Sequence, residues 1–223
     1  MQDFSLNRLI YENPLACAQD IEGFVTEGEA AASFAQGRLR LESTLDASLG
    51  QKSNFVFWCP VDFPQNLRIT WDFTPLREPG LCVFFFGAKG CGGEDILTGA
   101  LAPRTGEYDF YHHGDINAYH ISYFRRRYPE ERAFHTCNLR KSYGFHLVAQ
   151  GADPIPDVAD CDKSYALCLV RRDNHIEFFV NGLSVLQYDD DGALGAHIGG
   201  GKIGFRQMAP LIAEYANLKV YTE

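Results

Sequence analysis

The residues best suited to acid–base chemistry and anion binding lie between positions 112 and 146. This window holds five of the seven histidines: His112, His113, His120, His135 and His146. It also holds six Arg or Lys residues and three acidic residues, so its formal charge is +3 in a chain whose net charge is −9. Histidine exchanges protons near neutral pH, and the arginine fork binds carboxylates through two hydrogen bonds. The window therefore predicts a site for a small anionic ligand, although a solvated basic loop would have the same composition.

The spacing of these residues fits two β-strands that border a groove. In 119–126, alternation places Tyr119, Ile121 and Tyr123 on one face, with His120, Ser122 and Arg126 on the other. In 145–150, it places Phe145, Leu147 and Ala149 toward a core, with His146 and Gln150 opposite. Histidine and amide side chains are unusual on a merely solvated sheet face, so we expect a groove over residues 117–150.

The elements that would position these residues are strands. Residues 67–73 alternate strictly and should end at Thr74-Pro75, because proline cannot donate to a β-ladder. Residues 81–87 form a continuous apolar strand, and further strands are predicted at 37–42, 117–127, 143–150, 164–171, 175–181, 202–207 and 214–221. With no repeat or linker to divide the chain, this pattern predicts an all-β fold, a two-sheet antiparallel β-sandwich forming one domain over 1–223.

Three stretches resemble the concanavalin A-like lectin/glucanase jelly roll. They are the turn-separated strands of 165–182, the Gly-Lys-Ile-Gly-Phe-Arg strand of 201–206, and the closing strand of 213–220. Residues 114–126 and 136–154 are similar to the signature stretches of the YesU-like family of intracellular jelly-roll proteins. That resemblance implies a role with rhamnogalacturonan-like or related acidic glycans, but no mechanism.

For a uronate-containing oligosaccharide, β-elimination fits the residue types best. The reaction needs cations or amides on the carboxylate, a base for the α-proton and an acid for the leaving oxygen. We expect the catalytic groups among His120, His146, Tyr123 and Tyr143. The predicted substrate-binding residues are Asn117, Ser122, Arg125, Arg126, Asn138, Arg140, Lys141 and Gln150. Elimination of water from a sugar would use the same groups.

Three alternatives remain open. A jelly-roll glycoside hydrolase needs two positioned carboxylates, and Glu107-Tyr108-Asp109 is the nearest match, with His112 where a third acid would stand. A metal could bind His112, His113, Asp115 and His120, although adjacent histidines on a strand point to opposite faces. Non-catalytic binding of an acidic oligosaccharide on aromatic side chains is the third alternative. We expect no cofactor and no metal.

Composition excludes several other classes. The net charge of −9 argues against a nucleic-acid partner, and no apolar run approaches the length of a membrane span. The cysteine count of seven is odd, no CxxC pair occurs, and the N-terminus lacks the features of a secretory signal. We therefore expect a cytoplasmic protein with reduced thiols.

Overall fold

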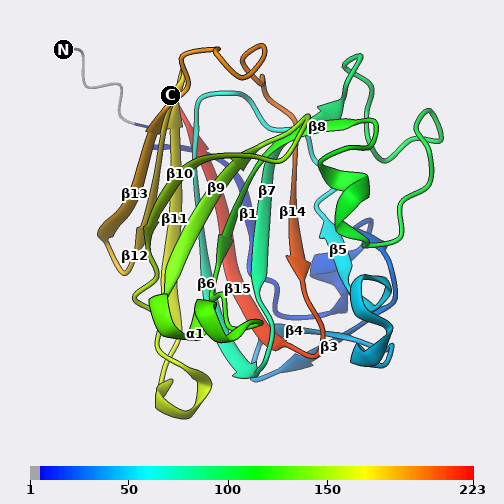
Figure 1. The fold of residues 1–223 in the computed structure, drawn as a ribbon, viewed down its shortest axis with the longest axis vertical. Helices are drawn as coiled ribbons and strands as arrows, with labels where there is room; N and C mark the ends of the chain where they lie inside the picture. The colour runs from blue at the N-terminus through cyan, green and yellow to red at the C-terminus, as the bar shows by residue number, and fades with distance from the viewer. Residues whose placement is uncertain (1–5) are drawn as a thin grey trace.

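The computed structural model describes residues 6–223, and its strands form two antiparallel sheets (Figure 1). The first sheet runs in the order β13 (Leu183–Asp189), β12 (His175–Val180), β11 (Tyr165–Arg172), β6 (Leu67–Arg77), β15 (Ile212–Thr222), β4 (Arg38–Ser43) and β3 (Ala30–Ala35), with β1 (Arg8–Asn13) also paired to β15. The second sheet runs in the order β10 (His146–Ala152), β9 (Thr136–Lys141), β8 (Ile116–Tyr123), β7 (Cys82–Gly90), β14 (Lys202–Gln207), β5 (Phe55–Trp58) and β2 (Val25–Glu27). The predicted two-sheet β-sandwich is confirmed.

Helical segments are short and lie in the connections. They are η1 (Ala18–Ile21), η2 (Ala47–Ser53), η3 (Tyr108–Tyr111), α1 (Pro129–Phe134) and η4 (Val158–Asp160). Helix α1 connects β8 to β9 at the end of the sheets opposite the C-terminus (Figure 1). No helix in residues 6–223 has the length and apolar character needed to cross a membrane.

The main core fills the space between the sheets. Trp71 of β6 is 1% exposed and stacks on Phe84 of β7, with 4.4 Å between ring centroids. Alternation explains this packing, because every second residue of β6 from Leu67 to Phe73 points to the same side. These apolar faces lose contact with water when the sheets pack together, which is the main force that stabilises a sandwich.

A second apolar cluster covers part of the other face of the second sheet. Val83 and Phe85 of β7 pack there with Trp58 of β5 and Tyr111 of η3, while Phe84 faces the main core. This explains why 81–87 is apolar without alternation, since both faces of β7 are buried. The connection between β7 and β8 supplies η3 and covers this part of the face, which leaves the rest for a site.

Two predicted strand ends were wrong. Strand β6 continues through Pro75 to Arg77, because β11 pairs with β6 only as far as Phe73 and Pro75 has a partner strand on one side only. Strand β8 ends at Tyr123 and not at 127, because Phe124 adopts a left-handed conformation with φ of 46°.

Candidate functional site

A pocket of about 310 Å³ opens on the outer face of the second sheet, beside the second apolar cluster. We call it the outer-face pocket. Its lining residues come from β7, β8, β9, β14 and the segments that flank them: Gln51, Leu81, Val83, Tyr108, Ser122, Arg125, Tyr128, Glu130, Glu131, Asn138, Arg140, Phe145, Arg206 and Met208. The size is at the lower end of the range typical of small-molecule sites, and the mixed apolar and charged lining suits a polar ligand.

Tyr108 and His120 form a hydrogen-bonded pair beside this pocket. The Tyr108 hydroxyl lies 2.7 Å from Nε2 of His120, which is 1% exposed on β8. Burial, with smaller contributions from Arg140, His112 and Arg206, holds the pKa of His120 well below its usual range. Burial also raises the pKa of Tyr108 to about 12. At neutral pH the pair therefore consists of a neutral imidazole and a protonated phenol.

Arginine side chains give the outer-face pocket its charge. Arg140 lies with its guanidinium carbon 3.7 Å from the centroid of the Phe145 ring, and Arg206 lies 4.7 Å from that of Tyr108. Neither has a carboxylate within ion-pair distance in residues 6–223. Arg125 differs, because its Nη2 lies 2.9 Å from Oε1 of buried Glu131. Two uncompensated cations therefore line the pocket.

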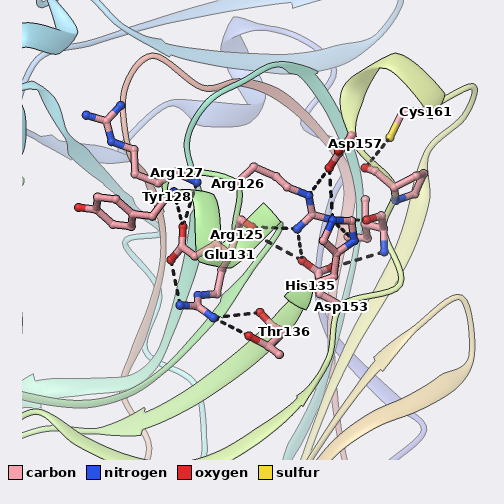
Figure 2. Close-up of polar contacts among 12 residues, drawn as sticks. Arg125, Arg126, Arg127, Tyr128, Glu131, His135, Thr136, Asp153, Asp157 and Cys161 are labelled. Carbon is pink, nitrogen blue, oxygen red and sulfur yellow. Dashed lines mark hydrogen bonds and ion pairs between the residues drawn. The ribbon is translucent and has the colours of Figure 1, made fainter. Parts of the chain in front are cut away.

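The segment before α1 fixes one wall of the outer-face pocket (Figure 2). The second carboxylate oxygen of Glu131 accepts hydrogen bonds from the backbone N–H groups of Arg127 and Tyr128, at 2.9 and 3.1 Å. Arg125 also donates to the hydroxyl of Thr136 at 2.6 Å. These contacts hold the start of α1 against β9, so Tyr128 and Glu130 stand at the rim.

Arg126 points toward Asp153, Asp157 and His135 (Figure 2) and does not line the outer-face pocket. Its side chain is fully buried, and its Nη1 lies 3.1 Å from the carboxylate of Asp153, which is also fully buried. Asp157 accepts from its Nε, and His135 lies 3.1 Å from its Nη2. Burial raises the pKa of Asp153, and the charge of Arg126 opposes that rise.

The domain of unknown function DUF1961 matches residues 8–220 of the chain. The chain belongs to the DUF1961 family. It is 48% identical to the uncharacterized protein YesU of Bacillus subtilis (strain 168), over 95% of the chain and 94% of the relative. It also matches a Bacillus subtilis crystal structure of unknown function with a galectin-like fold, at TM-score 0.94, 47% identity and 98% coverage of both chains. The carbohydrate recognition domain of Emp47p has TM-score 0.64 at 14% identity, covering 96% of this chain and 97% of its own. The predicted resemblance to the YesU-like family is thereby confirmed, and the predicted concanavalin A-like sandwich fits the galectin-like fold.

In this DUF1961 chain the structure brings together part of the predicted site. Ser122, Arg125, Asn138 and Arg140 line the outer-face pocket. Alternation predicted this face for Ser122, whereas Arg125 reaches it only because β8 ends at Tyr123. Gln150 lies in a hollow next to it, which Arg125 also lines, and its side-chain amide is 2.8 Å from that of Asn138. His120 lies on the same face, beneath Tyr108.

The prediction of Tyr123 as a catalytic residue is wrong. It is fully buried in the main core, packed edge-on against Phe73 with 5.1 Å between ring centroids. The period of two in β8 sends Tyr123 and His120 to opposite faces of the sheet, so one site cannot use both. Tyr143 is 54% exposed, packs beside His113 and does not line the pocket.

His146 was also placed wrongly, together with Phe145 and Leu147. His146 pairs directly with Lys141, whose Nζ lies 2.7 Å from buried Asp190, away from the outer face. A register shift between Leu147 and Ala149 reverses the alternation that the sequence suggests. As a result Phe145, predicted for the core, is 43% exposed and lines the pocket.

Besides Gln150, three predicted substrate-binding residues lie outside the outer-face pocket. Arg126 is held by its aspartates, and Lys141 is held by Asp190 and the carbonyl of Gly195. Asn117 lies near the start of β8, where it pairs with Lys89 of β7. These residues were predicted from their charge or polarity, but Arg126 and Lys141 connect segments of the fold through their ion pairs.

The structure lacks the geometry that two of the earlier alternatives require, the glycoside hydrolase and the metal site. Tyr108 and Asp109 belong to η3 and not to a strand, so strand alternation does not align Glu107 with Asp109 as a hydrolase pair requires. Within residues 6–223, no group of three or more His, Cys, Asp or Glu side chains is arranged to hold a metal ion.

Sequence reasoning missed Tyr108 and Arg206. Tyr108 was considered only as a spacer within Glu107-Tyr108-Asp109, and Arg206 only as the end of a strand motif. A signal was available for Arg206, because Lys202, Gly204 and Arg206 alternate with the apolar Ile203 and Phe205. No local pattern places η3 over β8, so Tyr108 could not have been found.

Proposed function

We propose that this protein binds a uronate-containing, rhamnogalacturonan-like oligosaccharide in the outer-face pocket and cleaves it by β-elimination. The observation that carries the proposal is the Tyr108–His120 pair, which sits beside a cavity lined by uncompensated arginines. The fold shared with a domain named for carbohydrate recognition supports a sugar as the ligand. Fold alone does not give chemistry, so the argument rests on the site.

The pair can move a proton in both directions. In the tautomer with its proton on Nδ1, His120 accepts a hydrogen bond at Nε2 from the Tyr108 hydroxyl. The Tyr108 oxygen takes the α-proton of the uronate while its own proton passes to His120. The C–H and C–O bonds break, a C=C bond forms, and the returning proton completes the hydroxyl of the leaving sugar. No net proton is consumed.

The cations make this step feasible. A positive charge on the uronate carboxylate stabilises the negative charge that develops as the α-proton leaves. Arg140 and Arg206 both lower the pKa of Tyr108, against the larger effect of burial. The same charges, after the larger effect of burial, lower the pKa of His120, so the imidazole is neutral at pH 7 and holds the proton from Tyr108 only transiently before returning it.

Hydrolysis is supported less well. The carboxylates that line the outer-face pocket are Glu130 and Glu131. Glu131 is engaged by Arg125 and by two backbone N–H groups, so it lacks the free acid or base function that a hydrolase needs.

Non-catalytic sugar binding is the second candidate. Tyr128 and Phe145 are 46% and 43% exposed at the pocket, and such rings suit stacking against a sugar.

For the location of the protein we propose the cytoplasm, because all seven cysteines are free thiols.

The test is incubation with a panel of uronate oligosaccharides, followed by ultraviolet absorbance of unsaturated uronate and by mass spectrometry of the products. Rising absorbance with a new unsaturated end supports cleavage by elimination. Loss of one water with the glycosidic bond intact indicates a dehydratase instead. Saturable binding with neither change overturns the lyase proposal in favour of the binding protein.

A further inference from the structure

Arg206 is a buried cation with an unusual set of partners. It lies on β14, is 1% exposed and lines the outer-face pocket. Its Nε and Nη2 donate to the carbonyl of Gly106 at 3.3 and 3.2 Å, and Nη2 also donates to the side chain of Gln51 at 2.9 Å. Its Nη1 has no partner. A buried polar group without a partner costs free energy, so a ligand that supplies one would bind favourably there.

Two other buried arginines of this chain have a carboxylate partner, whereas the buried Arg171 donates to the backbone carbonyls of Ile198 and Gly199. Arg104 has the carboxylate of Glu27 at 2.6 Å, and Arg126 has that of Asp153 at 3.1 Å. Within residues 6–223 Arg206 has no carboxylate at ion-pair distance. Both Nη atoms of Arg171 donate to carbonyls, whereas Nη1 of Arg206 has no partner in residues 6–223, so an anion can supply there what the protein does not.

The surroundings of Arg206 are fixed before any ligand arrives. Gln51 holds Nη2 and is itself held by the side-chain amide of Asn54 at 2.9 Å. The Tyr108 ring packs over the guanidinium. Because the fork is already oriented, little side-chain entropy is lost when an anion binds.

A second cation faces the same space. Arg140 donates from Nη1 to the carbonyl of Phe145 at 3.0 Å and lies over that ring. Its Nε and Nη2 make no hydrogen bond within residues 6–223. The third arginine of the lining, Arg125, is already neutralised by Glu131. Arg206 and Arg140 are therefore the two that remain for an anion.

We propose that Arg206, assisted by Arg140, binds the carboxylate of the ligand and sets the preference for uronates over neutral sugars. Of the three arginines that the sequence predicted for substrate binding, this assignment keeps Arg140 and replaces Arg125 and Arg126 by Arg206. It rests on the proposed function of the outer-face pocket. A carboxylate fits because its two oxygens can accept one hydrogen bond from each arginine. The Tyr108 hydroxyl would then be near the carbon that bears this acid group.

The experiment is calorimetric titration with digalacturonate, its methyl ester and a neutral digalactose. We expect the wild type to prefer the acid over the ester by about tenfold or more, and Arg206→Met to reduce this preference to about twofold or less. If the methionine variant unfolds, Arg206→Gln is tested in its place, because its amide can still donate to Gly106. We expect the same reduction of the acid preference in this variant. Arg172→Met is the matched control, because Arg172 is exposed on β11 of the other sheet, and it should keep the full preference.

Two results would overturn the proposal. One is a wild type that binds acid and ester equally or binds none of the three ligands. The other is a folded Arg206 variant that keeps the acid preference. Acid-dependent binding with no unsaturated product leaves the role of Arg206 intact and refutes only the elimination.

Discussion

The Tyr108 hydroxyl lies 2.7 Å from Nε2 of His120, although the two residues come from elements on different layers. Tyr108 belongs to η3 in the connection between β7 and β8, and His120 belongs to the middle of β8. His120 itself does not line the outer-face pocket, whereas Tyr108 does. Any proton that reaches His120 from a ligand therefore passes through the phenol.

This relay predicts the effect of removing the phenol. Tyr108→Phe should lower turnover of a uronate oligosaccharide by about 100-fold or more, because general acid–base groups contribute about that much. Initial rates of product formation give the measurement. Tyr143→Phe is the control, since Tyr143 is exposed outside the pocket, and it should stay within about twofold of the wild-type rate. Equal losses in both variants would contradict the relay.

The buried state of His120 predicts how stability depends on pH. Its pKa in the folded protein is well below the ordinary value of 6.5, so below pH 6.5 the unfolded chain binds a proton that the folded chain does not. The free energy of unfolding should therefore fall as pH drops below 6.5, by at most about 1.4 kcal/mol per pH unit from this group.

Urea unfolding between pH 7 and 5 measures this dependence. His120→Gln should flatten the slope, because glutamine does not titrate. His175→Gln, a surface change on β12, serves as the comparison and should keep more of the wild-type slope. An unchanged slope in His120→Gln would refute the assignment.

The Arg126–Asp153 pair predicts a large loss of stability. Asp153→Asn should lower the free energy of unfolding by about 3 kcal/mol or more, because it removes the charge that compensates a fully buried guanidinium. Chemical unfolding is the measurement. Glu12→Gln breaks the surface pair with Lys219 and should cost about 1 kcal/mol or less. A loss of similar size in the two variants would contradict the role of Asp153 in compensating the buried charge of Arg126.

The position of Phe145 predicts weaker ligand binding without loss of fold. Phe145→Ala removes the ring on which Arg140 lies, so sugar affinity should fall by about fivefold to tenfold, corresponding to about 1 kcal/mol. Titration with digalacturonate tests this. The exposed Leu183→Ala on β13 is the control and should bind as the wild type does. Unchanged affinity in Phe145→Ala would exclude the ring from the ligand contact.

The sequence by itself determined the all-β fold, nine of its strands and the faces of several of them, but it did not predict β1, β2, β3, β5, β9 or β13. Alternation in residues 67–73 correctly predicted a strand with Trp71 turned to the core, and alternation in 119–123 correctly separated Tyr119 and Ile121 from His120 and Ser122. This works because side-chain direction in a strand depends only on the period of two. The same period places Ser122, Asn138 and Arg140 in the pocket.

Only the tertiary structure decided which of these residues act together. The bulge in β10 turned Phe145 outward and moved His146 away from the pocket, and no pattern in the residues signals that shift. Nor could composition distinguish Arg126, which two aspartates hold in place, from Arg206, which has no such partner. Their difference depends on contacts between segments far apart in the chain, as does the meeting of Tyr108 with His120. Spacing encodes the direction of a side chain, whereas partners become defined only when the sheets pack and the connections fold over them.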